Sequence, residues 1–469
     1  MSSSSHGTRA PEAELGLVDA TMIGMGAMIG AGIFVLTGLA AETAGPAAIF
    51  VFLLNGVVTT FTALAYAELA SAIPKSGGGY AFVNEVFGRG VSFLMGWMLW
   101  FAYMIAGALY ALGFAPNVVE LLHSYALVPA PDQLASVVLT GLALGAVLAL
   151  TLLNVLSTAA SGRLETVFTA TKVTILVVFV AFGVVSTRFS PARFQPLFPA
   201  GHHPLGLLPA MGLTFIAFEG YDLITTVTEE VENPRRNIPR AIFLSLAATI
   251  LVYLAVVAVA IGTLGADRLG AAGETAIAQA ATSFMPALPV VGNGGVLIVF
   301  GAVFSTLTAL NAVVIASSRV AFSMGRDGNF LRRFGQLHSR YGTPFVAVAV
   351  SSIVMLAAIT LLPVRQVGNL SSLFFLLSFV VVNGSVIRLR RERPDMQRPF
   401  EMPLYPLPPV LGIVCNLVLG LFIDWRIWAL GLGWVVVGGA VYGAIRHFEG
   451  RNEQSNESNR PETPDETPE

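Results

Sequence analysis

The sequence has little charge. Only 12% of its 469 residues are Asp, Glu, Lys or Arg, about half the share that is typical of a soluble domain. The formal net charge is −2. The chain therefore has no basic field of the kind that binds nucleic acid, and we exclude nucleic acid as a partner.

Several other features are scarce or missing. Cys415 is the single cysteine, which excludes an intramolecular disulfide. The histidines fall in predicted tails and loops, so we predict no metal site. No GxxxxGK[ST] loop is present, so we expect no ATP binding, no other cofactor and no enzymatic activity. The first apolar segment lacks the charged start and the cleavage site of a signal peptide.

What the chain does have is long apolar runs. Hydrophobic residues make up 55% of the sequence, and a bilayer requires about 20 of them in succession for each helical crossing. The sequence predicts an all-α membrane protein, surrounded by lipid. We predict twelve transmembrane helices, at 17–40, 46–72, 88–113, 134–156, 164–187, 205–230, 240–263, 292–323, 345–363, 367–388, 406–423 and 427–447.

The distribution of Lys and Arg predicts the orientation. With the N-terminus inside, 20 of the 26 basic residues lie on the cytoplasmic side, and Lys172 lies within a helix. Both termini are therefore expected in the cytoplasm of a multi-pass plasma-membrane protein. The five on the outer side are Arg188, Arg193, Arg268, Arg365 and Arg426.

The chain is predicted to form one membrane domain, at 15–448, between two disordered cytoplasmic tails. Residues 1–14 are polar, and residues 449–469 are acidic and contain no aromatic residue, a composition that does not fold alone. The longest outer loop, near 264–291, has an Ala-rich stretch from Glu274 to Phe284 that predicts a short surface helix.

The first apolar segment is unusually rich in glycine. In a helix each glycine costs about 1 kcal/mol relative to alanine, and an unwound backbone in lipid leaves polar groups unpaired at several kcal/mol each. Such a break is tolerated where a polar ligand or another partner satisfies those groups. Four glycines occupy nine positions of this segment, at Gly24, Gly26, Gly30 and Gly32.

Two interpretations of the glycines remain open. Gly26 and Gly30 form a GxxxG pair, which is typical of close helix packing. Alternatively, the residues Met28, Ile29, Gly30 and Ala31 are unwound, and a half-helix that begins near Gly32 directs its N–H groups at an anion.

The sixth apolar segment contains a second interruption. The stretch from Thr214 to Asp222 places a glycine and two acidic residues at bilayer depth. Interruptions five helices apart are typical of transporters with inverted repeats and a binding site at the midplane. Helices 1–5 and 6–10 would form the repeats. Helices 11 and 12 lie outside them and are free to form a homodimer.

Three motifs carry a family resemblance. Met28-Ile29-Gly30-Ala31-Gly32-Ile33-Phe34 resembles the helix 1 signature of the amino acid–polyamine–organocation superfamily, and the stretches Ala65–Tyr80 and Glu229–Ala241 resemble its loops after helices 2 and 6. The chain is similar to the proton-coupled, cationic-amino-acid-transporter-like branch of bacteria and archaea. This resemblance implies a leucine-transporter-like fold, with a 5+5 inverted repeat and broken helices 1 and 6, and amino acid substrates.

The resemblance also implies how the substrate carboxylate is bound. It would meet the backbone N–H groups of Ala31, Gly32 and Ile33. Many relatives have serine at the position of Ala31, so one side-chain hydrogen bond to the carboxylate is expected to be missing here.

For the substrate ammonium, the resemblance implies backbone carbonyls as acceptors. Met28 would supply one carbonyl from helix 1, and Phe215, Ala217 or Phe218 would supply another from helix 6. This division follows the exposed ends of the half-helices, where N–H groups face the anion and C=O groups face the cation. Tyr103 in the third segment is a candidate to cap the bound substrate.

Lys172 is one of only two lysines and lies in the fifth apolar segment. A charge within a membrane helix indicates a function by default, although a lysine near a helix end can also extend its amine to the interface. The resemblance places Lys172 where sodium-coupled relatives bind their ion, which implies proton coupling. Its ammonium is expected to bond carbonyls around Ile29, with Ser305 or Thr308 as further partners.

The acidic residues have two predicted roles. Glu219 is predicted to be a proton-sensitive gate or to bind substrate amines, whereas Asp222 could simply open the second half of helix 6. Near the cytoplasmic ends of helices, we predict interfacial ion pairs that close the inner gate. They would be formed by Glu68, Asp19, Glu165 and Arg319.

The sequence thus predicts a secondary active transporter that takes up amino acids by proton symport and alternating access. The coupling ion would be a proton, with Lys172 as its carrier. Two alternatives remain: a sodium-independent exchanger of amino acids or polyamines, and a transporter-like amino acid sensor. The short acidic tail argues against the sensor, which needs a soluble output domain.

Overall fold

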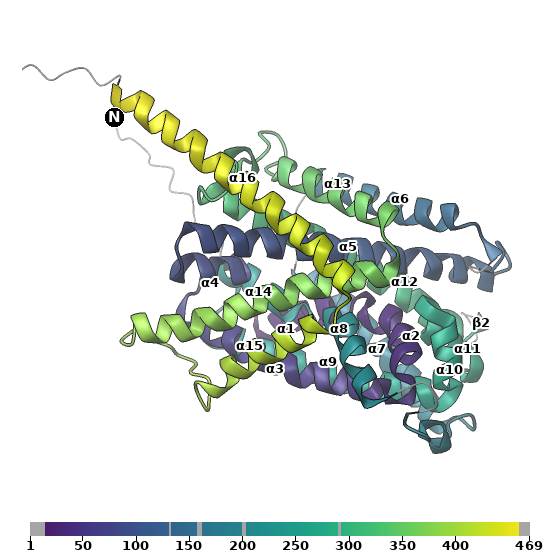
Figure 1. Cartoon of the computed structure of the whole chain (residues 1–469). Coiled ribbons are helices and arrows are strands. Elements are labelled where there is room, and N and C mark those ends of the chain that lie inside the picture. The colour runs from purple at the N-terminus through teal and green to yellow at the C-terminus, as the bar shows by residue number, and fades with distance from the viewer. Residues whose placement is uncertain (1–14, 131–132, 157–161, 199–202, 289–291, 459–469) are drawn as a thin grey trace, which may run out of the picture.

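A computed structural model describes residues 15–130, 133–156, 162–198, 203–288 and 292–458 of the chain (Figure 1). The predicted N-terminal tail lies outside this part. The apolar runs are helical, as their length and lack of charge require. The first half contains α1 (Leu17–Met28), α2 (Ala31–Ala44), η1 (Gly45–Ala47), α3 (Ala48–Ala72), α4 (Gly78–Val86), α5 (Arg89–Ser124), α6 (Ser136–Leu156), α7 (Gly162–Val185), η3 (Pro191–Phe194) and η4 (Pro204–Gly206).

The second half is also mainly helical, with short 3₁₀ segments at its start. A hairpin of two-residue strands, β1 (Ala287–Leu288) and β2 (Gly292–Asn293), precedes α12. The helices are α8 (Leu207–Thr214), η5 (Phe215–Phe218), η6 (Tyr221–Glu230), α9 (Pro234–Leu264), α10 (Ala266–Ala272), η7 (Gly273–Thr275), α11 (Ala276–Phe284), α12 (Gly295–Arg326), η8 (Arg332–Gly335), α13 (Phe345–Leu361), α14 (Val364–Glu392), α15 (Leu407–Leu421) and α16 (Trp425–Ser458).

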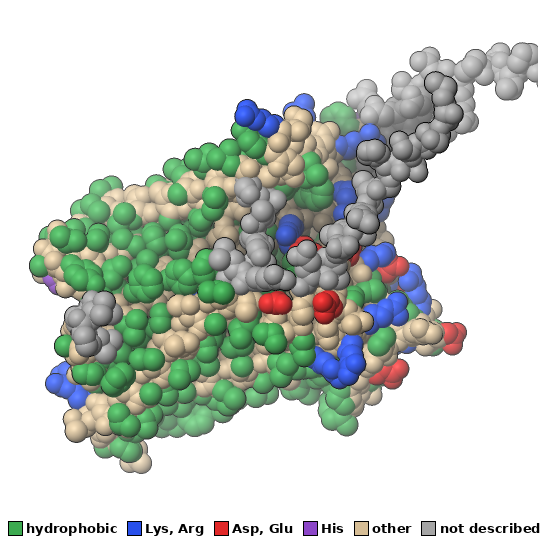
Figure 2. Space-filling view, turned by 180° about the vertical axis from the view of Figure 1, so that it is seen from behind, with side chains coloured by type: hydrophobic (Ala, Val, Ile, Leu, Met, Phe, Trp, Pro, Cys, Tyr) green, Lys and Arg blue, Asp and Glu red, His purple; other side chains and the backbone are tan. Residues whose placement is uncertain are grey.

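The described part of the chain has 9 helical stretches that are long and apolar enough to cross a membrane. The first, Leu17–Ala72, contains the first two predicted segments, and α13 and α15 are shorter apolar helices. Hydrophobic side chains cover the visible flank of the molecule, and most of the Lys and Arg side chains gather toward one end (Figure 2). The protein is an all-helical integral membrane protein.

Helix α5 lies at the centre of the bundle. In its most apolar stretch 89% of the residues are buried, against 17% for α6 and for α16. The long helix α16 crosses the outside of the bundle (Figure 1). Aromatic stacking joins it to α5, because the Trp434 ring lies 4.6 Å from Trp97 and 4.2 Å from Phe101 between centroids. Such pairs contribute about 0.5–1.5 kcal/mol beyond the area that they bury.

Two predicted segments differ from the structure. The apolar span of α16 ends at Phe448, but the helix continues to Ser458, so the first part of the predicted tail is helical. The Ala-rich stretch does form a helix, α11, but five of its nine residues are buried. It packs against α2, α9 and α12 and is therefore a half-buried element of the bundle.

Candidate functional site

The first broken helix has the interruption that its glycines predict. Helix α1 ends at Met28 and α2 begins at Ala31, with Ile29 (φ −76°, ψ 53°) and Gly30 (φ −91°, ψ −130°) between them. No side chain caps the start of α2. The first N–H groups of a helix have no partner within it, so this end of α2 can receive an anion.

Side chains from other helices satisfy the carbonyls that the break frees. The Ser305 hydroxyl of α12 lies 2.5 Å from the Ile29 carbonyl and 3.1 Å from that of Gly30. The Lys172 ammonium of α7 donates to the Gly26 carbonyl at 3.0 Å. Lys172 was predicted to bond a carbonyl near Ile29, but that carbonyl accepts from Ser305. Lys172 therefore bonds α1 about one turn earlier, at Gly26.

The prediction that Thr308 is a partner of Lys172 also needs correction. The Thr308 hydroxyl donates to the Ser305 carbonyl of its own helix at 3.0 Å. It therefore supports α12 rather than the broken helix.

Lys172 is fully buried, with 0% of its surface exposed. The alternative in which it extends to the membrane interface is therefore wrong. Gly26 allows α7 to approach this closely: a β-carbon there would lie 2.1 Å from Thr169 Oγ1 and 2.7 Å from Glu165 Oε1. Gly26 thus serves helix packing, as the GxxxG interpretation predicts, within a helix that is also broken.

The second broken helix is interrupted at Glu219 and Gly220, between η5 and η6. Gly220 has φ +137°, a conformation that side chains rarely adopt. Its N–H donates to Asp222 Oδ1 at 3.0 Å, and the Tyr103 hydroxyl donates to the other oxygen of Asp222. Asp222 therefore opens the second half of the helix, the role predicted for it.

The two breaks pack directly against each other. A β-carbon on Gly32 would lie 2.7 Å from the Cα of Ala217, and one on Gly220 would lie 2.6 Å from the backbone nitrogen of Met28. These glycines let the two unwound segments meet backbone to backbone. The predicted recognition groups of the two helices therefore share one site.

Tyr253 of α9 is a residue of this site that the sequence analysis missed. Its hydroxyl donates to the Met28 carbonyl and lies 2.9 Å from the Ala217 carbonyl. These are two of the carbonyls predicted to bind the substrate ammonium. A tyrosine within an apolar run was an available signal, because a buried tyrosine hydroxyl usually finds a partner.

The predicted phenylalanines of η5 face other aromatic rings. Between ring centroids, Phe218 lies 5.3 Å from Tyr253 and 6.3 Å from Phe52. The ring centroid of Phe215 lies 6.1 Å from that of Phe379. Both side chains are fully buried. Their rings therefore hold η5 in place. The groups of η5 that were predicted to bind the substrate ammonium are its backbone carbonyls, not these side chains.

A small cavity adjoins both breaks. Ala27, Glu219 and Gly220 line it, together with Tyr103 and Tyr110 of α5. A larger pocket, which we call the vestibule, lies beside it and is lined by Arg319 among other residues. The two spaces share three lining residues, Ala27, Leu223 and Ala312.

Comparison with known proteins decides the family. Residues 15–435 match the family model described as amino acid permease. The chain belongs to this family. It is 31% identical to the branched-chain amino acid permease BcaP of Bacillus subtilis over 93% of both chains. It is 30% identical to the methylthioribose transporter of the same organism, over 91% of this chain and 92% of the relative, and 30% identical to BcaP of Lactococcus lactis, over 90% and 92%. These findings point to a transporter and not to an enzyme.

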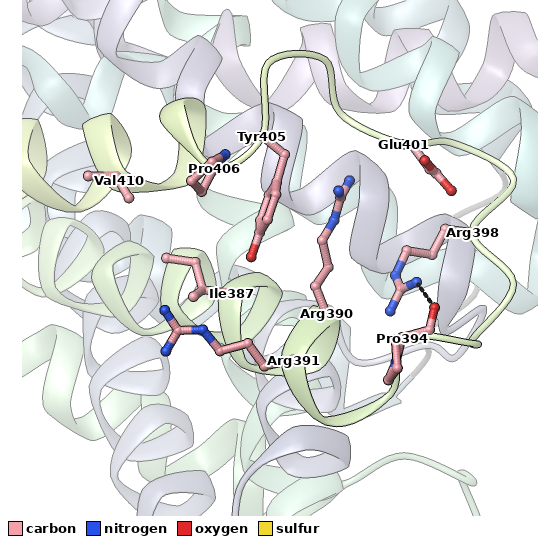
Figure 3. Close-up of a pocket in the computed structure, with 9 residues that line it drawn as sticks. All are labelled: Ile387, Arg390, Arg391, Pro394, Arg398, Glu401, Tyr405, Pro406 and Val410. Atoms are coloured by element: carbon pink, nitrogen blue, oxygen red, sulfur yellow. Dashed lines mark hydrogen bonds between the residues drawn. The ribbon is translucent and has the colours of Figure 1, made fainter.

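Glu68 of this permease forms an ion pair, as predicted, but with a partner that the sequence did not indicate. Glu68 of α3 forms a two-pronged pair with Arg390 of α14, at 2.6 and 2.7 Å, and accepts the Met402 N–H at 2.9 Å. The guanidinium of Arg390 lies 4.1 Å above the Tyr405 ring. Arg390 lines a surface pocket with Arg391, Arg398, Glu401 and Tyr405 (Figure 3). The contact ties α3 and α14 to the segment that precedes α15.

The other predicted ion pairs are wrong. Asp19 accepts hydrogen bonds from the Gly16 N–H at 3.1 Å and from the Thr166 hydroxyl at 2.8 Å. Within the described ranges, neither Asp19 nor Glu165 nor Arg319 forms an ion pair. Glu165 and Arg319 instead line the vestibule.

Another ion pair joins the loop after α3 to α4. Lys75 contacts Glu85 at 2.8 Å, and Arg393 contacts the same carboxylate at 3.1 Å. The hydrogen bond from Lys75 is the main reason that the pKa of Glu85 is lowered from its ordinary value. Unlike Glu68, which is 1% exposed, Glu85 has 30% of its side chain exposed, and water weakens its contribution.

Replacing Arg390 by alanine is expected to lower the free energy of unfolding by about 2 kcal/mol, because it removes both charged hydrogen bonds to the buried Glu68 carboxylate and leaves only the longer charged contact with Arg398 at 3.8 Å. Thermal unfolding of the purified protein in detergent measures this effect. The control is Arg365→Ala, which breaks an exposed pair with Glu42 worth about 1 kcal/mol at most. Equal losses for the two variants would contradict the importance of burial at Glu68.

Proposed function

We propose that this permease is a secondary active transporter that takes up amino acids across the plasma membrane by proton symport with alternating access. One observation carries the proposal. Two broken helices meet backbone to backbone, and a buried lysine bonds a carbonyl of one of them. This arrangement supplies a site for a zwitterion and, beside it, a group that can carry a proton.

The proposed topology has twelve spans, with both termini in the cytoplasm. Its first repeat would run from α1 to α7, and its second from α8 to α14. Each of the twelve predicted segments is mainly helical within the described residues, and the sixth contains the 3₁₀ helices η5 and η6. Helices α15 and α16 would lie outside the repeat and could form a homodimer contact. The unequal distribution of arginines supports the orientation.

The substrate would be held by its backbone groups. Its carboxylate would lie at the uncapped start of α2, against the N–H groups of Ala31, Gly32 and Ile33. Its ammonium would donate to the carbonyls of Met28 and Ala217. Tyr253 faces both carbonyls but has only one hydroxyl hydrogen, so an ammonium would supply the donor that is missing there.

Lys172 would couple this site to the proton gradient. An ammonium has three hydrogens to donate and a charge, and loss of the proton removes the charge that strengthens its bond to Gly26. The grip of α7 on the first broken helix would therefore change with protonation. Substrate and proton would both bind one conformation better than the other, which is what transport requires.

Uptake into proteoliposomes tests the proposal. With an acidic outside and one proton per substrate, a gradient of one pH unit supports about tenfold accumulation. The panel should contain the twenty amino acids and methylthioribose, because one relative is named for that compound. Counterflow exchange that ignores the gradient would favour the exchanger, and accumulation of methylthioribose alone would contradict amino acid transport.

A further inference from the structure

The surface pocket around Arg390 lies where α14 ends and α15 begins (Figure 3). We call it the arginine pocket, because Arg390, Arg391 and Arg398 line it. Its volume is about 640 Å³, which equals that of about twenty water molecules in the liquid. The pocket therefore has room for a small polar group, such as a phosphate and its glycerol.

The positive charges of the arginine pocket exceed the acids that face them. The buried Glu68 carboxylate lies 2.6 Å from Arg390 and 3.8 Å from Arg398, so it balances one of these two charges. Glu401 is exposed and is the one acid among the described residues that line the pocket. Arg391 is exposed and forms no ion pair within the described ranges. Three arginines against two acids leave one positive charge for an anion.

One side of the arginine pocket is charged and the other is apolar. The Tyr405 ring lies between the two sides (Figure 3). In that view, one side contains Arg390, Arg398 and Glu401, and the other contains Ile387, Pro406 and Val410. A ligand that fits both sides must itself carry a charged part and an apolar part.

The apolar side of the pocket continues along α15. Exposed residues recur there at spacings of three and four, which places them on one face of the helix. They are 41–76% exposed and comprise Leu407, Val410, Val414, Leu417 and Leu421. Because α15 belongs to a membrane protein and is apolar throughout, this face meets lipid chains, and the arginine pocket lies at its first turn.

We propose that the arginine pocket binds the headgroup of an anionic phospholipid, with its phosphate at Arg391 and an acyl chain along the exposed face of α15. The planar fork of an arginine matches a phosphate with two hydrogen bonds. Basic pockets between membrane helices on the cytoplasmic side bind anionic headgroups, and this end of α14 is predicted to face the cytoplasm. Tyrosine is typical of headgroup depth. A soluble phosphate compound would use the arginines but leave the apolar face unused.

Lipid binding to the purified protein in detergent, measured by native mass spectrometry, tests the inference. The wild type is expected to bind dioleoyl phosphatidylglycerol at least about tenfold more tightly than dioleoyl phosphatidylcholine, and Arg391→Gln should weaken phosphatidylglycerol binding about tenfold, the change expected for loss of charged hydrogen bonds. The control is Arg388→Gln, which removes the same charge from a residue of α14 that pairs with Glu392 and lies outside the pocket. It should change binding by less than about threefold.

A variant with the opposite effect guards against misfolding. Glu401→Gln removes the acid of the pocket and should tighten phosphatidylglycerol binding about threefold, a gain that an unfolded protein does not show. If Arg391→Gln does not fold, this variant decides the matter: tighter binding supports the inference, and unchanged binding overturns it.

Three other results would also overturn the inference. The first is equal affinity of the wild type for the two lipids. The second is equal loss in Arg391→Gln and Arg388→Gln, which indicates attraction by the overall positive charge. The third is binding of glycerophosphoglycerol, the headgroup without its chains, as tight as that of phosphatidylglycerol, which indicates a site for a soluble phosphate compound. None of these measurements depends on transport, so the proposed function stands or falls separately.

Discussion

Replacing Lys172 by alanine is expected to abolish the accumulation of substrate that a pH gradient drives, while exchange of substrate across the membrane persists. The residue is fully buried and donates to the Gly26 carbonyl at 3.0 Å. Without an amine at this position, uptake would no longer require a proton. Accumulation at a gradient of one pH unit should then fall from about tenfold to about onefold. Proteoliposome uptake with and without the gradient measures the change.

The only other lysine provides the control. The side chain of Lys75 is 62% exposed and pairs with Glu85 at 2.8 Å, so Lys75→Ala should cost about 1 kcal/mol or less and keep the response to the gradient. Thermal unfolding of both variants separates loss of coupling from loss of folding. A Lys172→Ala protein that accumulates substrate as the wild type does would show that the proton binds elsewhere.

Local features of the sequence were enough to predict the two breaks. The glycines around Gly30, and the pair Glu219 and Gly220, interrupt their own helices within a few residues. Such effects depend on backbone propensity, which is a property of the segment itself. The twelve apolar runs are likewise predicted from each segment alone, and the described part of each is mainly helical.

Contacts between distant segments were harder to predict. Tyr253 reaches Met28 across 225 positions of the chain, and Ser305 reaches Ile29 across 276. Which carbonyl each side chain meets depends on how its helix is rotated against α1. That rotation is set by close packing at the glycines of the first broken helix, where Ser245 of α9 approaches Gly24 and Ala309 of α12 approaches Gly30, and the sequence pattern does not encode it.

The acidic residues show the same limit. The sequence placed Glu219 and Asp222 at the break, but their different roles depend on Tyr103, which comes from another helix. The Asp222 carboxylate accepts hydrogen bonds, whereas neither carboxylate oxygen of Glu219 has a hydrogen-bond partner within the described residues. Only the assembled site therefore distinguishes an acid that shapes the backbone from one that lines the small cavity.

Replacing Gly220 by alanine is expected to reduce transport to background and to destabilise the protein by about 3 kcal/mol. The residue has φ +137°, which strains any residue with a side chain by about 1–3 kcal/mol. The new β-carbon would also lie 2.6 Å from the backbone nitrogen of Met28 and 2.7 Å from the Ala27 side chain. Because backbone cannot move aside as a flexible side chain can, the two breaks would be forced apart. Counterflow uptake and thermal unfolding measure the two effects.

Gly384 is the matched control for this substitution. It lies within α14, and a β-carbon there would meet nothing within 4 Å. Alanine at such a helical position is expected to raise stability by about 0.4–1 kcal/mol and to leave transport unchanged. If Gly220→Ala were as active as Gly384→Ala, the close contact between the two broken helices would not be needed for transport. The contrast between the variants thus tests whether both breaks act as one binding site.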